Sequence, residues 1–248
     1  MDAICRQALS LGLSEIAFTD HLDLHLKMSG CFYLEHEKER EAAYRAVQEK
    51  YRRRLAVRYG LELGQPDWNQ TFLNDFNAAR SFDFILGSVH YTTDDQEILE
   101  IAYQSKAQAD GVLREYFQNV RRMLEGDGYD AVAHLCHPLR AMERVWQKPT
   151  LLMYGDAIRP ILRRAAERGK ALEVSTKGLR YWIHALEPEM EILRWYRELG
   201  GEYVTVGTDS HEADTVGSGI REAYDYIRQA GFRYVTRYEA RRPVLVPI

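Results

Sequence analysis

The segment FDFILGSVH, residues 82–90, joins a short apolar run to an ionisable residue. Such a run, bounded by polar residues, is typical of a buried strand, which here would end at His90. Five further segments repeat the pattern along the chain: IAFTDH to His21, RYGLE to Glu62, AVAH to His134, ALE to Glu173, and TVGTDSH to Asp209 and His211. Only His, Asp and Glu end these six runs, which is hard to reach by chance.

Amphipathic stretches separate the apolar runs. The strands are expected at Glu15–Thr19, Leu55–Leu61, Phe82–Val89, Asp130–Ala133, Ala171–Val174, Glu202–Gly207 and Arg233–Arg237. The helices are expected at Leu34–Arg54, Gln96–Gly126, Asp156–Arg168, Glu187–Leu199 and Asp214–Ala230. This alternation predicts an α/β fold with parallel strands and right-handed crossovers. A barrel is favoured over an open doubly wound sheet, because the carboxyl ends of barrel strands share one face, where active sites lie.

Composition places the chain among ordinary globular proteins. The 248 residues are 46% hydrophobic and 28% charged, and we expect one domain over residues 1–248. The net charge of −4 gives no overall basic footprint for nucleic acid. No apolar run approaches the roughly 18 residues that span a membrane. Cys5, Cys31 and Cys136 suggest no disulfide framework, so a cytoplasmic location is expected.

The strand-end residues predict a metal site. Imidazole and carboxylate ligands without a thiolate cluster suit Zn²⁺, Mn²⁺ or Fe²⁺ at a hydrolytic centre. The pattern allows more than one metal. The candidate ligands are His21, Glu62, His90, His134, Asp209 and His211.

Other residues near the strand ends are weaker candidates. His25 is expected in a loop, and of the HLCH cluster only His134 is expected to be a ligand, with Cys136 and His137 at the pocket rim. Arg140 and Arg180 follow strand ends, where a planar guanidinium suits a pair of phosphate oxygens, although a surface salt bridge explains each one nearly as well. Lys177 lies in the loop of Arg180, and Glu173 is expected to line the pocket.

Taken in order, IAFTDH, GLELG, FDFILGSVH, DAVAHLCHPLR, LEVSTKGLR, VTVGTDSHEADTVGSGI and AGFRYVT resemble the histidinol-phosphatase branch of the polymerase-and-histidinol-phosphatase (PHP) superfamily. The resemblance covers nearly the whole chain. It implies a distorted (βα)7 TIM-like barrel with up to three divalent metals. It also implies hydrolysis of a small phosphate ester, L-histidinol phosphate, to L-histidinol and phosphate in histidine biosynthesis.

The resemblance also implies roles for individual residues. Glu62 would bridge two metals, His90 and His134 would bind one of that pair, and Asp209 the other. His21 and His211 would bind the third metal. Arg140 and Arg180 would hold the phosphate, and the catalytic residues would be Glu62, Asp209 and His211. The Arg233–Arg237 strand would lie outside the barrel.

One family feature is missing from the sequence. Family members open with a strand that carries a His-X-His motif, and this chain contains no such motif. It begins instead in an expected helix that Asp2 can cap, with Ile4, Ala8 and Leu11 on one apolar face. We therefore expect the first barrel strand and about three ligands to be lacking through a misplaced start, a shortened chain or a real truncation, of which a misplaced start is favoured.

Three other functions are considered for this chain. The first is a related phosphoesterase that acts on another small phosphate ester. The second is an inactive, metal-poor scaffold, which the missing strand suggests. The third is a metal-dependent amidohydrolase, which is disfavoured because such sites use a modified lysine at a strand end and no lysine ends a strand here.

Overall fold

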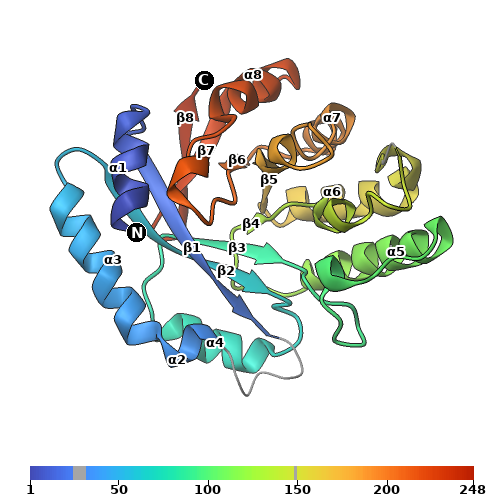
Figure 1. Cartoon of the computed structure of the whole chain (residues 1–248), viewed down its shortest axis with the longest axis horizontal. Helices are drawn as coiled ribbons and strands as arrows, with labels where there is room; N and C mark the ends of the chain where they lie inside the picture. Colours follow the sequence, from blue (N-terminus) through green and yellow to red (C-terminus); the bar gives the residue numbers. More distant parts are fainter. Residues whose placement is uncertain (25–31, 148–149) are drawn as a thin grey trace.

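The computed structural model describes residues 1–24, 32–147 and 150–248. Six parallel strands form one curled sheet in sequential order, as Figure 1 shows. This arrangement confirms the expected distorted barrel-like α/β fold. The strands are β1 (Glu15–Asp23), β2 (Ala56–Gly64), β3 (Phe84–Ser88), β4 (Ala131–Val132), β5 (Ala171–Ser175) and β6 (Val204–Gly207).

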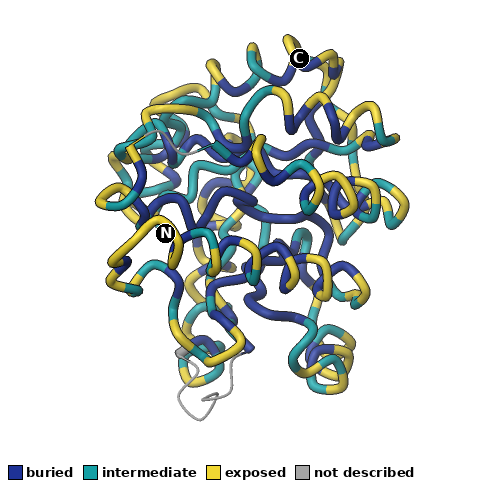
Figure 2. Tube along the Cα trace, turned by 90° about the vertical axis from the view of Figure 1, so that its right-hand side faces the viewer, coloured by how far each residue is buried: buried dark blue, intermediate teal, exposed yellow. Residues whose placement is uncertain are grey.

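Helices lie along the outer side of the curled sheet, and the central strands β3, β4 and β5 are almost wholly buried, whereas the edge strand β1 is mostly only partly buried (Figures 1 and 2). The α-helices are α1 (Asp2–Ser10), α2 (Phe32–Glu35), α3 (Glu37–Tyr51), α4 (Gln70–Ala78), α5 (Lys106–Met123), α6 (Gly155–Glu167), α7 (Met190–Glu198) and α8 (Ile220–Gln229). Short 3₁₀ turns are η2 (Ile98–Glu100), η3 (His137–Ala141), η4 (Leu152–Tyr154), η5 (Lys177–Arg180) and η6 (Ala213–Thr215). No described helix is both long and apolar enough to cross a membrane.

Helix α5 illustrates how the sequence builds the outer layer. Its buried residues recur every three or four positions, at Ala109, Leu113, Tyr116, Val120 and Met123. This spacing gives one continuous apolar stripe on a helix. Burying the stripe against the strands removes apolar surface from water at about 25 cal/mol per Å². The helix is thus held mainly by this face.

The parallel register brings strand-end residues together. His21 in β1 pairs with Glu62 in β2, and Glu62 in turn pairs with Leu86 in β3. His90 follows β3 by two residues, and His134 follows β4 by two residues. Because parallel strands end at the same edge of the sheet, these side chains gather at one end.

Helices α5 and α4 differ from the sequence-based expectation. The helix expected at 96–126 begins only at Lys106, because the Ile98 N–H donates to the His90 carbonyl and folds the preceding segment back onto the end of β3. Ser105 then caps α5 by accepting a hydrogen bond from the N–H of Gln108. Helix α4 is not predicted from the sequence, although its cap, Asn69, is a residue type that commonly starts helices.

The last strand lies outside the sheet, as expected. Strand β7 (Tyr234–Glu239) pairs with β8 (Arg242–Pro247) in an antiparallel hairpin, and β8 is not predicted from the sequence. Strands β1 and β6 form the two edges of the six-stranded sheet. A cavity of about 800 Å³ is lined by residues of both edge strands, by the start of α1 and by the strand-end side chains.

Candidate metal centre

Glu62 lies at the middle of the strand-end cluster. Its Oε1 atom is 2.7 Å from His134 Nε2 and 3.0 Å from His90 Nε2, and its Oε2 atom is 3.7 Å from His21 Nε2. The side chains of Glu62, His90 and His134 are buried, whereas that of His21 is 44% exposed. The structure therefore brings three of the other five predicted ligands around the Glu62 carboxylate, with His21 toward solvent.

Asp23 belongs to this cluster but is missed by the sequence analysis. It is the last residue of β1, and its Oδ1 atom lies 2.5 Å from His90 Nδ1. With that nitrogen as donor to Asp23, Nε2 is the ring nitrogen that faces Glu62, and it could bind a metal after losing its proton. Carboxylates often orient metal-binding histidines in this way. A signal existed in the sequence, since Asp23 lies two residues after His21 and thus on the same face of the strand.

The charges in the cluster are set by burial and by neighbouring groups. Burial would raise the pKa of Glu62, but the attraction of His21 and other imidazoles outweighs it and holds that pKa well below its usual range. Burial would lower the pKa of His90, yet Asp23 and Glu62 together raise it to about 10. Burial lowers the pKa of His134. Glu62 is thus ionised at neutral pH, as a metal-bridging carboxylate must be.

Backbone geometry aims two candidate ligands into the site. His134 has φ of 21° and Asp209 has φ of 46°, which are uncommon values for residues with a side chain. The Glu173 Oε2 atom accepts a hydrogen bond of 2.8 Å from the His134 N–H and so fixes this backbone. A Cβ atom at Gly207 would lie 1.9 Å from Glu173 Oε1, so glycine leaves room for the Glu173 side chain in this position.

Asp209 lies among three basic residues. Its Oδ2 atom is 2.8 Å from both Arg140 Nη1 and Lys177 Nζ. Arg180 Nη2 donates to the backbone carbonyls of Thr208 and Asp209. Burial would raise the pKa of Asp209, but positive charge nearby, including Arg140 and Lys177, lowers it. The loops after β4 and β5 thus bring positive charge to Asp209, which lies in the loop after β6.

Arg140 is not a surface residue. Its guanidinium donates to Glu187 Oε2 at 2.8 Å and to Ser175 Oγ at 3.2 Å, in addition to Asp209, and its side chain is 1% exposed. The surface salt bridge considered as the alternative explanation for Arg140 is therefore wrong, because both acidic partners hold the side chain inside. Arg180 is only partly buried, and its Nη1 atom has no hydrogen-bond partner among the described residues.

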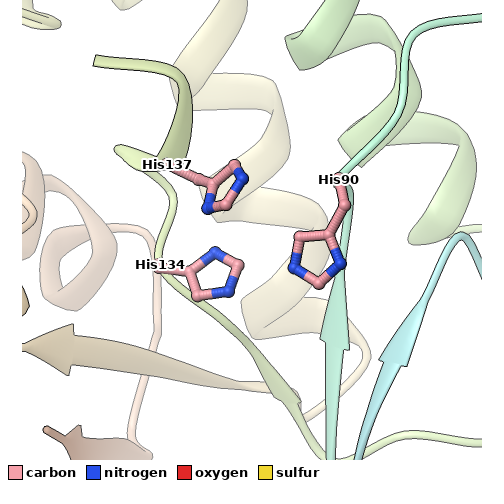
Figure 3. A group of neighbouring side chains, drawn as sticks. All are labelled: His90, His134 and His137. Carbon is pink, nitrogen blue, oxygen red and sulfur yellow. The ribbon is translucent and has the colours of Figure 1, made fainter. Parts of the chain in front are cut away.

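The remaining candidate residues differ in how close they lie to the Glu62 cluster. The ring of His211 lies 6.1 Å from that of His21, and its side chain is 63% exposed. Glu173 lines the cavity, as expected. His137 lies deeper than the rim position expected from the sequence, because η3 turns its side chain against His90 and His134 (Figure 3). His25 falls outside the described residues.

The side chains fit a divalent transition metal. Ligand atoms that share a tetrahedral zinc ion lie about 3.3 Å apart, given bonds of about 2.0–2.1 Å. The 2.7 and 3.0 Å separations between Glu62 and the two histidines are close to this value. Two groups of side chains bring one ligand atom each within 4.8 Å of one another: His21, Glu62 and His90, and His90, His134 and His137. His134 Nδ1 is also buried without a partner among the described residues.

Comparisons with known proteins identify relatives of this chain. The chain is 28% identical to a probable histidinol-phosphatase of Deinococcus radiodurans, over 92% of this chain and 86% of that protein. It is 25% identical to the histidinol-phosphatase of Lactococcus lactis, over 94% and 86%. A solved structure of histidinol phosphate phosphatase from Lactococcus lactis, in complex with zinc, L-histidinol and phosphate, matches with a TM-score of 0.80 and 24% identity, over 98% of this chain and 92% of that one. The PHP domain matches residues 1–177, so the chain belongs to the PHP domain family.

Proposed function

We propose that this protein is a metal-dependent phosphomonoesterase that hydrolyses L-histidinol phosphate to L-histidinol and phosphate. The observation that carries the proposal is the convergence of His21, His90 and His134 on the Glu62 carboxylate. The similarity to two curated histidinol-phosphatases over more than nine-tenths of this chain supports the choice of substrate. The single domain expected over residues 1–248 is part of the proposal, as is a cytoplasmic location.

The metals would be held by the predicted ligands. Glu62, kept ionised, would bridge two ions, with His90 and His134 on one and Asp209 on the other, while His21 and His211 would hold a third. Zn²⁺, Mn²⁺ and Fe²⁺ all suit this set of imidazoles and carboxylates. When bound, the metals would activate water and neutralise charge on the phosphoryl oxygens.

The basic residues would bind the phosphate. Arg180 has a guanidinium nitrogen with no partner among the described residues, so it can donate to a phosphate oxygen without losing a contact. Arg140 is held rigidly by Glu187 and presents Nη1 at Asp209. Fixed cations of this kind stabilise the charge that develops during phosphoryl transfer, at little reorganisation cost. Lys177, next to Asp209, would add to the same field.

A substrate panel tests the proposal. The full chain, loaded separately with Zn²⁺, Mn²⁺ and Fe²⁺, is assayed for phosphate release from L-histidinol phosphate, a sugar phosphate, a nucleotide and a generic aryl phosphate. We expect the highest kcat/KM for L-histidinol phosphate. Equal or faster turnover of the generic esters would refute the assignment of substrate, and hydrolysis of none of them would favour the inactive scaffold.

A further inference from the structure

His137 is a buried histidine that the proposed ligand set does not use. It opens the turn η3, three residues after His134, and its N–H donates to the His134 carbonyl at 2.7 Å. This turn brings the two rings to a centroid separation of 4.7 Å. The His137 residue is only 6% exposed, and it does not line the 800 Å³ cavity. Its place is therefore in the wall behind the Glu62 cluster.

Neither ring nitrogen of His137 has a hydrogen-bond partner among the described residues. A neutral imidazole always carries one N–H and one lone pair, so both nitrogens are unsatisfied in either tautomer. Each buried polar group left unpaired costs about 1–3 kcal/mol. A leucine would fill the space without this cost. A histidine at position 137 is therefore better explained if its ring binds a metal ion than if the ring only fills space.

Two further imidazoles face the same spot. Figure 3 shows the rings of His90, His134 and His137 turned toward one another, and each offers one nitrogen within 4.8 Å of the others. The His90 and His137 rings are 5.0 Å apart between centroids. His134 Nδ1 likewise has no hydrogen-bond partner in the part of the chain that the structure describes. Asp23 accepts from His90 Nδ1 and thereby orients that ring. Three buried imidazole rings thus share one small space.

We propose that His137 is a metal ligand and completes a three-imidazole site for a zinc-like divalent ion with His90 and His134. The inference deepens the proposed function, since it adds a ligand to the same centre. Three imidazole ligands favour Zn²⁺ and neighbouring transition metals over Mg²⁺ and Ca²⁺, which prefer oxygen ligands. With Glu62, whose Oε1 atom lies beside His90 and His134, the ion would have four protein ligands.

The test measures metal binding by the full chain, not turnover. Metal-free wild type, His137→Gln and a control, His184→Asn, are titrated with Zn²⁺ by calorimetry and with Co²⁺ by visible absorption. His184 is an exposed histidine with a positive φ, so Asn suits its backbone and removes one imidazole. We expect His137→Gln to lose one zinc equivalent, or to bind it about 100-fold more weakly, and to change the cobalt spectrum. The control variant His184→Asn should have the same zinc stoichiometry, zinc affinity and cobalt spectrum as wild type.

Unchanged zinc stoichiometry, affinity and cobalt spectrum in His137→Gln would overturn the proposal and leave His137 as a packing residue. His137→Leu provides a second variant that fills the same space if the Gln variant does not fold. In the wild type, the ring-nitrogen resonances of His137 should shift when Zn²⁺ is added, and unshifted resonances would equally refute the site. Turnover of L-histidinol phosphate is measured separately. Loss of a zinc equivalent in His137→Gln, with no turnover in wild type, would uphold this site while refuting the proposed function.

Discussion

Glu173 gives the sharpest test of the electrostatics of the centre. Its carboxyl is buried, and burial raises its pKa to about 8. Its Oε2 atom accepts the His134 N–H at 2.8 Å. Glu173→Gln keeps the size of the side chain and an oxygen acceptor, but it removes the ionisation. The substitution therefore separates the structural hydrogen bond from the titration of the carboxyl.

The magnitude follows from proton linkage. The Glu173 pKa is about 8 in the folded chain, against an ordinary value of 4.5. Between these two values the folded state holds a proton that the unfolded state has released, so the free energy of unfolding falls as pH rises. Each pKa unit corresponds to about 1.4 kcal/mol, so the metal-free protein loses about 3 kcal/mol from this group between about pH 5 and pH 8. In Glu173→Gln this contribution disappears.

The assay is urea unfolding of the metal-free full chain at pH 5 and pH 8. The readout is the difference in pH dependence between Glu173→Gln and wild type, because several histidines of the centre also titrate in this range. Glu167→Gln is the matched control, since Glu167 is an exposed glutamate on α6. We expect the variant to retain about 3 kcal/mol more stability than wild type on going from pH 5 to pH 8. An identical pH dependence in the two proteins would refute a neutral, buried Glu173.

Three further substitutions test the surroundings of the site. Arg140→Met leaves the buried Glu187 without its cation and Asp209 with Lys177 alone, and it should cost about 3–5 kcal/mol in urea unfolding. Gly207→Ala places a Cβ atom 1.9 Å from Glu173 Oε1 and should lower stability by about 1–3 kcal/mol, seen as a lower Tm. Glu62→Gln removes the central carboxylate and should abolish phosphate release and lower the zinc content by elemental analysis, while unchanged zinc content would contradict a bridging Glu62.

Residues that face the centre were predictable because each is marked locally. An apolar run of strand length ending in His or Glu is visible without knowing what packs beside it. Parallel pairing then places all such ends together, as the register of His21 with Glu62 shows. The wrong prediction of where helix α5 begins has a different cause. The fold-back of Ile98 onto His90, which delays α5, depends on a contact with β3 that no local pattern in residues 96–105 reveals.

Residues that hold the ligands in place are marked by no local pattern, because their roles arise only between elements. Arg140 and Glu187 are 47 residues apart in sequence, and only folding makes them a buried pair. Gly207 resembles an ordinary glycine at a strand end, and its φ is not in the left-handed region. It is required because the register of β5 with β6 brings the carboxyl of Glu173 into the space of a Cβ atom. In this position Glu173, on β5, accepts the hydrogen bond from the His134 N–H. The orientation of the predicted ligand His134 therefore depends on contacts between the ends of β4, β5 and β6.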